Sequence, residues 1–292
     1  MKKPFFQRNP FRRAAHSAGL ALASGGAKGV AHIGVIESLE EMGITIECVA
    51  GSSIGAVVGA VYVCGSLKRF REAMLAMTRR KMFQLVDPVF PKSGFIRGDK
   101  LVEFLGDFIP AGVRFEDLPI PLAVVATDFG TGQRAVFTQG LVLPAVRASM
   151  SIPGVFEPVE IGGRIYVDGG AADVLPADLP RRLGARRVIA VGLHPPPEGS
   201  LGTVMSEERF LEVPSKGYAR AKKSPGVISV VMRSIDIMDH ATEAASIAAD
   251  KPDVLILPEI HQIGTLEFDQ STAAIGAGRA AAAARSREIA RL

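Results

Sequence analysis

Residues 48–59 read CVAGSSIGAVVG and place Ser53 at the centre of the pattern Gly-x-Ser-x-Gly. The run is apolar before the serine and rich in small residues after it, which predicts a strand that turns sharply into a helix. Gly51 and Gly55 suit such a turn, because a Cβ at either position would collide with the strand or the helix. The N-terminus of that helix favours negative charge near the serine. Alone, the five-residue pattern is a weak signal, so its surroundings decide its meaning.

The segments before this turn predict a βαβ unit. Residues 19–23 are a short apolar strand, residues 24–29 a glycine-rich loop, and residues 30–43 a helix that ends at a glycine. A second strand over residues 44–50 leads into the serine turn. This order predicts a parallel sheet covered by helices.

Further elements continue to the C-terminus. Helices are expected at residues 66–82, 99–109, 141–149, 176–183, 226–249 and 270–292. Strands are expected at residues 121–127, 134–138, 159–161, 164–167, 188–193 and 254–257. Residues 194–225 include three consecutive prolines and are interpreted as a surface excursion or flap. We expect a basic arm over residues 1–18, followed by one domain over residues 19–292.

Composition excludes several classes of protein. The 292 residues are 48% hydrophobic and 22% charged, so the chain can bury a large core. A formal net charge of +4 is far from that of a nucleic-acid-binding protein, and no nucleic-acid partner is expected. Cys48 and Cys64 lie in apolar surroundings and are interpreted as buried thiols of a reducing compartment. No cluster has metal-ligand spacing, and we expect neither a metal nor a cofactor.

Two segments raise the question of membrane contact. Residues 1–18 interleave five Lys or Arg residues with three Phe residues. This arm is interpreted either as a disordered terminus or as a patch that touches anionic lipid. Residues 48–67 carry no charge, but Gly-Ser-Ser near their start and Glu47 directly before them argue against a membrane span. We therefore expect a cytoplasmic protein, with peripheral contact at the inner membrane as an open alternative.

Three glycine-bearing turns follow predicted strands, at residues 24–29, 51–55 and 168–170. Because the carboxyl ends of parallel strands face one crevice, we expect these turns to meet. They would then supply the groups that acyl transfer needs, with Ser53 as nucleophile and Asp168 as the carboxylate that accepts its proton. Backbone N–H groups of the first turn would stabilise an oxyanion.

The glycine-rich loop at residues 24–29 allows other interpretations. It could bind a dinucleotide, but its first position is Ser24, and no acidic residue ends the next strand where a ribose would bind. It is not a P-loop, because Lys28 is followed by Gly29 and not by Ser or Thr.

The base also has alternatives. Asp168 alone would more often be an ordinary turn residue. A Ser-Asp-His order is formally available, because three histidines follow Asp168: His194, His240 and His261. Against this order, Ser53 follows the second strand, earlier than the nucleophile of an ordinary α/β-hydrolase.

Four motifs in this order resemble those of bacterial patatin-like phospholipases: SGGAKG at residues 24–29, GSSIG at 51–55, RASMSIPGVF at 147–156 and DGG at 168–170. The resemblance extends from about Leu20 to Leu193. It implies a three-layer α/β/α fold with a mainly parallel central sheet. One departure is Ser24, where the family usually has glycine.

The resemblance also implies roles for individual residues. Ser53 would be the nucleophile and Asp168 the base of a Ser-Asp dyad. The oxyanion hole would be formed by Gly25, Gly26, Ala27, Lys28 and Gly29. The nucleophile elbow would contain Gly51, Ser52, Ile54 and Gly55, and the Asp-Gly-Gly motif would be completed by Gly169 and Gly170. The implied activity is hydrolysis of acyl esters of phospholipids or related lipids. A soluble carboxylesterase or thioesterase, and a non-catalytic regulatory protein on the same fold, are the alternatives.

Neighbouring side chains have supporting expectations. By resemblance, Arg147 would hydrogen-bond the loop at residues 149–154. Val167 and Ile165 would desolvate Asp168 and raise its pKa. The wall of an acyl-chain site, or a lip facing a membrane, could include Phe83, Phe90, Phe95 and Ile96, with core packing as the alternative.

Overall fold

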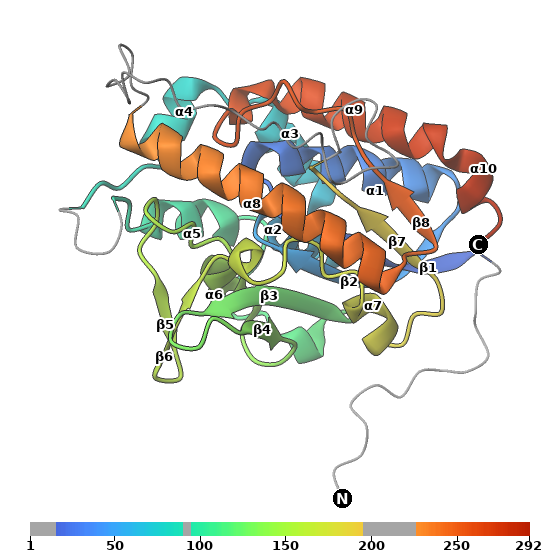
Figure 1. Ribbon diagram of the computed structural model, residues 1–292, viewed down its shortest axis with the longest axis horizontal. Coiled ribbons are helices and arrows are strands. Elements are labelled where there is room, and N and C mark those ends of the chain that lie inside the picture. Colours follow the sequence, from blue (N-terminus) through green and yellow to red (C-terminus); the bar gives the residue numbers. More distant parts are fainter. Residues whose placement is uncertain (1–15, 90–94, 195–225) are drawn as a thin grey trace, which may run out of the picture.

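In the part of the chain that the structure describes, a sheet of eight strands lies at the centre (Figure 1). The structure is a computed structural model and describes residues 16–89, 95–194 and 226–292. The strands are β1 (Ser17–Leu22), β2 (Thr45–Ser52), β3 (Leu122–Asp128), β4 (Arg134–Phe137), β5 (Val159–Ile161), β6 (Arg164–Val167), β7 (Val188–Val191) and β8 (Val254–Ile256). Their order is β5-β6-β3-β2-β1-β7-β8, with β4 also paired to β3. Strands β3, β2, β1, β7 and β8 run parallel, whereas β4, β5 and β6 add antiparallel pairs at one side.

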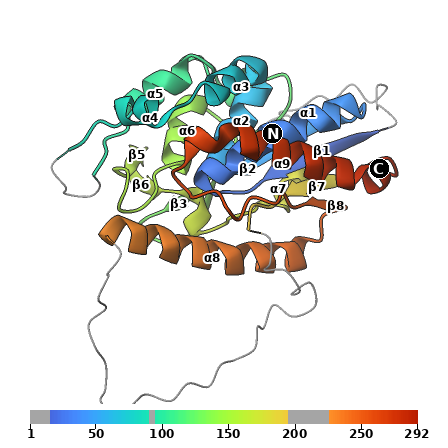
Figure 2. The same cartoon turned by 90° about the horizontal axis from the view of Figure 1, so that it is seen from above.

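Helices cover both faces of this sheet. They are α1 (Ala31–Glu41), α2 (Ile54–Val63), α3 (Leu67–Leu75), α4 (Arg79–Gln84), α5 (Asp99–Gly106), α6 (Val142–Ser149), α7 (Leu179–Arg182), α8 (Val227–Asp250), α9 (Ser271–Ala284) and α10 (Ser286–Ile289). Short 3₁₀ segments are η1 (Gly26–Val30), η2 (Phe115–Asp117), η3 (Gly169–Ala171) and η4 (Phe268–Gln270). Figure 2 shows α8 along one side of the sheet, with α1 and α9 on the other. The predicted α/β/α fold with a mainly parallel sheet is confirmed.

Several predicted boundaries differ from those of the structure. The single helix expected over residues 66–82 is two helices, because the Thr78 side chain accepts a hydrogen bond from the Lys81 amide and begins α4 anew. The helix expected over residues 176–183 shortens to α7, whose early Pro180 is tolerated only in a first turn. The last expected helix is divided into α9 and α10 at Arg285.

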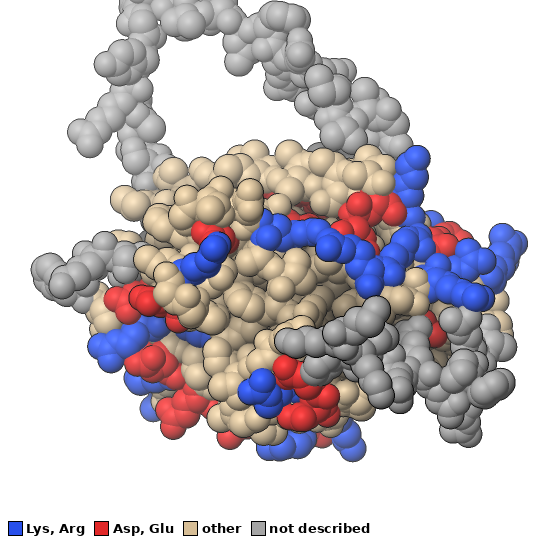
Figure 3. Space-filling model, turned by 90° about the horizontal axis from the view of Figure 1, so that it is seen from below, with Lys and Arg blue, Asp and Glu red and all other residues tan. Residues whose placement is uncertain are grey.

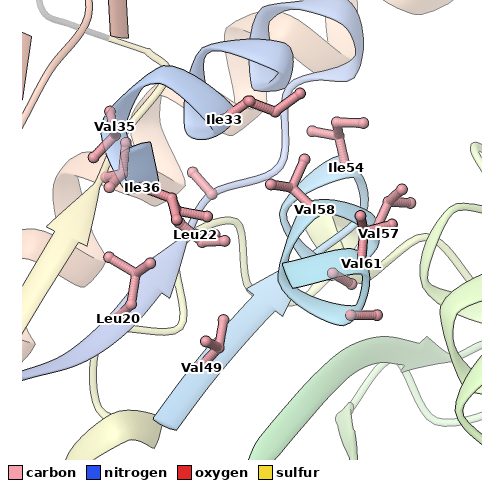
Figure 4. Close-up of a cluster of buried hydrophobic side chains, with 14 of the residues drawn as sticks. Leu20, Leu22, Ile33, Val35, Ile36, Val49, Ile54, Val57, Val58 and Val61 are labelled. Carbon is pink, nitrogen blue, oxygen red and sulfur yellow. The ribbon is translucent and has the colours of Figure 1, made fainter. Parts of the chain in front are cut away.

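The main core lies between the sheet and the layer that contains α1 and α2 (Figure 4). Leu22 of β1 and Val49 of β2 are completely buried, as are Ile36 of α1 and Val58 of α2. Fully buried parallel strands are expected to be nearly continuous apolar runs, and β1 and β2 have this composition. The core therefore fixes the turn after β1 and the turn after β2 relative to each other.

Helix α9 packs on α1 so closely that the main chains of the two helices are in contact. A Cβ on Gly34 of α1 would collide with the carbonyl oxygen of Ile275, and a Cβ on Gly278 of α9 would collide with that of Ala31. Only glycine permits this separation, because the space of a side chain is occupied by the partner's main chain. The C-terminal helix thus supports the helix that follows the first glycine-rich turn.

This packing predicts opposite effects for two alanine substitutions in one helix. Gly278→Ala should lower the free energy of unfolding by about 1–3 kcal/mol, because the added methyl group overpacks the α1 interface. Gly276→Ala is the control, since a Cβ there meets no atom within 4 Å, and it should be neutral or stabilising by up to about 1 kcal/mol. Urea denaturation measures both, and equal stabilities of the two variants would contradict the packing argument.

Candidate active site

Ser53 lies on a strained turn between β2 and α2. Its φ of 51° and ψ of −120° are uncommon for a residue with a side chain. Glycines on either side make the turn possible: a Cβ on Gly51 would collide with the backbone of Gly55, and a Cβ on Gly55 would collide with the carbonyl of Leu22. The turn thus brings α2 against the end of β1. The amide of Ser53 donates to Ser149 Oγ over 2.8 Å, which holds the strained residue from its other side.

The side chain of Ser53 hydrogen-bonds directly to Asp168. Its Oγ donates to Asp168 Oδ2 over 2.6 Å, and both residues are buried. The second carboxylate oxygen, Oδ1, accepts from the Gly170 amide over 2.8 Å. The main chain of Asp168 is fixed as well, because its amide donates to Ser151 O and its carbonyl accepts from Thr127 Oγ1. Besides the bond from Ser53, three hydrogen bonds therefore hold Asp168, one at the carboxylate and two at the main chain.

Burial raises the pKa of Asp168 to about 7. Hydrogen bonds from Ser53 and Gly170 act against this rise, and the negative charge of Asp239 adds to it. Val167 is buried beside Asp168 as expected, but Ile165 is half-exposed, so the expectation that Ile165 desolvates the carboxylate is wrong. Ile165 lies in the exposed first half of β6, whereas Tyr166 and Val167 in its second half are buried. With a pKa near 7, the carboxyl group can gain and lose a proton close to neutral pH.

The three glycine-bearing turns lie together as expected, although the third follows β6, which runs antiparallel to β3 and ends beside Thr127 near the carboxyl end of that strand. The first turn contacts the second, since a Cβ on Gly29 would overlap the side chain of Ile54. It also contacts the third, because a Cβ on Gly170 would lie 2.8 Å from Ser24 Oγ. A Cβ on Gly169 would collide with the carbonyl of Val125 in β3. Small residues thus let three chain segments approach one crevice.

The amides of the first turn are not equivalent. Gly25 and Gly26 have φ values of 153° and 58°, which favour glycine. Their N–H groups donate to no acceptor within the described part of the chain. The amide of Ala27, by contrast, donates to Thr265 O over 2.8 Å. Of the residues predicted to form an oxyanion hole, Gly25 and Gly26 therefore have available donors and Ala27 does not.

The structure adds three acidic residues of α8 that the sequence analysis missed. Asp236 forms an ion pair with the ammonium group of Lys28, and Asp239 Oδ2 accepts from Ser24 Oγ over 3.2 Å. Glu243 is the third of these acidic residues and is buried. The spacing i, i+3, i+7 places all three on one helix face, which was the available sequence signal.

Glu243 and His194 form the deepest part of this network. Glu243 accepts from the amides of Leu193 and His194, each over 3.1 Å, and contacts His194 Nδ1 at 3.0 Å. His194 Nε2 lies 3.8 Å from carboxylate oxygens of both Asp236 and Asp239. The imidazole is thus surrounded by α8 carboxylates and buried, although it opens the segment interpreted as a surface excursion. Residues 195–225 of that segment lie outside the described residues.

No histidine lies between Ser53 and Asp168, because the two side chains bond directly. His32, one turn beyond the first glycine-rich loop, is fully buried, with Nε2 2.9 Å from Ala23 O. Burial lowers its pKa to about 4, so it is neutral at physiological pH.

An apolar cavity of about 440 Å³ reaches Ser53. Its wall includes Gly26, Ser53 and Ile54, followed by apolar side chains of α2 to α5 and of two loops around residues 150–156 and 265–268. Phe83 and Ile96 line the cavity, in agreement with the expectation that they form the wall of an acyl-chain site. Phe90 lies outside the described residues. A cavity of this size and polarity fits an apolar chain.

Arg147 supports the loop behind the serine. Its guanidinium donates to Ser151 Oγ over 2.6 Å, to Arg97 O over 2.6 Å and to Glu157 O over 3.0 Å. The charge also lies 5.5 Å from the centre of the Phe156 ring. These contacts match the expectation that Arg147 hydrogen-bonds this loop.

The described residues contain neither a metal-binding cluster nor a membrane-spanning helix. No group of three or more His, Cys, Asp and Glu side chains there could hold a metal ion. None of the helices there has both the length and the apolar character needed to cross a membrane. Cys48 is buried as expected, whereas Cys64 is only half-buried. Residues 1–15 of the predicted basic arm lie outside the described residues.

Comparisons with known proteins agree on one family. A family model described as patatin-like phospholipase matches residues 20–181. An uncharacterized NTE family protein of Mycobacterium tuberculosis is 43% identical over 175 residues, which cover 60% of this chain and 48% of that protein. A second such protein of the same species is 33% identical over 298 residues, covering 94% and 47%. Lysophospholipase NTE1 of Debaryomyces hansenii is 27% identical over 264 residues, covering 86% and 17%.

The chain thus spans about half the length of its mycobacterial relatives. The matched region of the family model includes all three glycine-bearing turns and covers more than half of this chain. The chain belongs to the patatin-like phospholipase family.

Proposed function

We propose that this chain hydrolyses acyl esters of phospholipids or related lipids with Ser53 as nucleophile and Asp168 as base. The observation that carries the proposal is the 2.6 Å hydrogen bond from Ser53 Oγ to Asp168 Oδ2 at the wall of an apolar cavity. A serine hydroxyl needs a base to become a good nucleophile, and a carboxylate of raised pKa can act as one near neutral pH.

In the first half of the reaction, Asp168 accepts the hydroxyl proton while Ser53 Oγ attacks the ester carbonyl carbon. The carbonyl oxygen becomes an oxyanion, which the available amides of Gly25 and Gly26 would stabilise. The tetrahedral intermediate then expels the alcohol, which takes the proton from Asp168. An acyl group remains bound to Ser53 Oγ.

In the second half, a water molecule replaces the alcohol. Asp168 accepts a proton from the water, whose oxygen attacks the acyl carbon. Collapse of this intermediate releases the fatty acid, and Ser53 Oγ recovers its proton from Asp168. The enzyme returns to its starting state without another reactant.

The apolar cavity supports a long acyl chain as the substrate group. Most of its lining is apolar and includes Met74 of α3 together with Leu101 and Phe104 of α5. One relative is named a lysophospholipase, which supports a lipid with a single acyl chain. Esters of increasing chain length test this assignment: a preference for short water-soluble esters over lysophospholipid would favour a carboxylesterase instead.

Two substitutions test the dyad. Ser53→Ala should lower kcat for lipid hydrolysis at least about a thousandfold, because the nucleophile is lost. Asp168→Asn should lower it about a hundredfold or more while keeping the side-chain shape. Product analysis by mass spectrometry measures the activity, and circular dichroism checks the fold.

Labelling with a fluorophosphonate separates an enzyme from a non-catalytic protein. Wild type should be labelled at Ser53, and Ser53→Ala should not. A folded wild-type protein that resists the reagent would support a regulatory role. Near wild-type turnover by Asp168→Asn would overturn the assignment of the base.

The raised pKa of Asp168 predicts a pH profile. Because the base must be ionised, kcat/KM for a soluble ester should rise with pH and reach half its plateau near pH 7. Asp239→Asn should move this midpoint to lower pH, because its negative charge contributes to the rise of the Asp168 pKa. Asp250→Asn, on the same helix, is the control and should leave the midpoint in place. Identical midpoints for all three proteins would contradict the electrostatic link.

The same group has a consequence for stability. The folded pKa of Asp168 lies above its unfolded value of 3.8, so folding favours the protonated form. The stabilisation that the protonated Asp168 gives to the folded state is complete below about pH 4 and is lost as the pH rises through about 7. The free energy of unfolding of Asp168→Asn, relative to that of wild type, should therefore be higher at pH 8 than at pH 5. Urea denaturation at the two pH values measures this difference.

A further inference from the structure

The first glycine-rich turn contains two residues whose main chain is not restricted by a side chain. Gly25 and Gly26 have main-chain angles that glycine favours. The direction of the Gly25 N–H group depends on how the preceding residue is held, because this N–H lies in the planar peptide between Ser24 and Gly25. A donor for an oxyanion must already point in the right direction when the reaction begins. The contacts of Ser24 therefore bear on the chemistry of the site.

Ser24 is held at its main chain and at its side chain. Its amide donates to Val174 O over 2.9 Å, and its Oγ donates to Asp239 Oδ2 over 3.2 Å. The residue is 2% exposed, so the second bond lies away from water. This is the position at which the chain has serine and the family usually has glycine, which could form the main-chain bond but not the other. Ser24 thus gives the turn an additional anchor on α8.

Asp239 is itself held among buried neighbours. On the face that Figure 3 shows, charged side chains lie at the surface, with Asp and Glu beside Lys and Arg. Asp239 and Glu243 are instead 8% and 1% exposed. Asp239 Oδ2 lies 3.8 Å from His194 Nε2, and Nδ1 of the same ring lies 3.0 Å from Glu243 Oε2. The acceptor that Ser24 uses therefore belongs to a buried network between α8 and the end of β7.

The same network lies directly behind Gly25. A Cβ on Gly25 would be 2.9 Å from Leu193 Cδ1 and 3.7 Å from His194 Cε1. The amides of Leu193 and His194 both donate to Glu243, each over 3.1 Å. Gly25 therefore contacts the end of β7 directly and is linked to α8 through Ser24.

Ser24 also lies beside the turn of the proposed base. Its Oγ is 2.8 Å from the position of a Cβ on Gly170, and the Gly170 amide donates to Asp168 Oδ1 over 2.8 Å. One hydroxyl group thus contacts the turn that holds the base and anchors the turn that holds the oxyanion donors. Loss of this hydroxyl would leave space between the two turns.

We propose that Ser24 and Asp239 are positioning residues, which fix the direction of the Gly25 N–H group through the hydrogen bond between their side chains. Both act through Gly25 and not on the substrate, and their role rests on the reaction proposed above. The bond holds the donor in advance in the direction that the transition state needs. Without it, the glycine-rich turn has other conformations available, so the chemical step slows while substrate binding is unchanged.

Kinetics above the midpoint of the pH profile test this role, because Asp168 is then ionised in wild type and variant. Ser24→Ala should lower kcat for a monomeric long-chain ester about tenfold or more and leave KM unchanged. The Ki of a long-chain trifluoromethyl ketone should rise by the same factor, because Ser53 Oγ adds to its carbonyl carbon and the carbonyl oxygen becomes an oxyanion. Wild-type values of kcat and Ki for Ser24→Ala would overturn the proposal.

Thr242→Ala is the matched control. It also removes a hydroxyl group, which donates to Met238 O over 2.9 Å within α8, and it should leave kcat and Ki unchanged. Circular dichroism checks that both variants fold. Equal losses in Ser24→Ala and Thr242→Ala would point to a general effect of α8 and overturn the proposal.

Two substitutions of Asp239 separate its position from its charge. Asp239→Asn keeps an oxygen that can accept from Ser24, so its plateau kcat should stay within about threefold of wild type although the midpoint shifts. Asp239→Ala loses the acceptor and should fall as far as Ser24→Ala. The variant with both alanines should fall no further, because both changes break one bond. Equal losses for Asp239→Asn and Asp239→Ala, or additive losses in the double variant, would overturn the proposal.

The rate of fluorophosphonate labelling separates this proposal from the proposed function, because the reagent needs no lipid. Ser24→Ala should be labelled at Ser53 about tenfold more slowly than wild type. If wild type is labelled but hydrolyses no lipid, and Ser24→Ala is labelled slowly, the lipid substrate is wrong and the positioning role stands. If wild type hydrolyses lipid and Ser24→Ala is labelled at the wild-type rate, the positioning role is wrong and the proposed function stands.

Discussion

The close approach of α2 to the end of β1 at Gly55 is the constraint on which the site depends. No side chain fits between Gly55 and the Leu22 carbonyl, so α2 begins directly against the sheet. This contact forces the chain at Ser53 into a strained conformation with φ of 51°. Strain of this kind costs about 1–3 kcal/mol and persists only where the surroundings determine the backbone. Here the buried core of β1, β2, α1 and α2 supplies those surroundings.

The second cost in the site is electrostatic. Asp168 is buried far enough that its carboxyl pKa rises to about 7, even though two hydrogen bonds favour the ionised form. An unburied carboxylate would be a much weaker base, and a carboxylate paired with a cation would be weaker still. The negative charge of Asp239 raises the pKa of Asp168 further, in the same direction as burial. Burial of Asp168 thus lowers the free energy of unfolding near neutral pH and at the same time makes the carboxylate a stronger base. Perturbed pKa values of this kind are common in active sites.

Local patterns were sufficient to predict the parts of the site that depend on backbone sterics. Glycine spacing around Ser53 and after Asp168 predicted the turns, and parallel topology predicted that the first two meet. The third turn follows an antiparallel strand, β6, so its position beside the others was predicted correctly but for a reason that does not apply to it. The sequence could not show the contacts of α8, because Ser24 and Asp239 are 215 positions apart and nothing in either segment specifies the other. The break after α3 was missed because the side chain of Thr78 competes locally with helix continuation.

The hydrogen bond from the Ala27 amide to Thr265 gives the C-terminal third of the chain a part in the active site. The family match ends at residue 181, but the first glycine-rich turn is held by Thr265, and its Ser24 and Lys28 are held by α8. A protein cut at the end of the matched region would keep Ser53 and Asp168 and lose the outer support of the turn between them. The region that the family model matches is therefore smaller than the unit that must fold together to position the site.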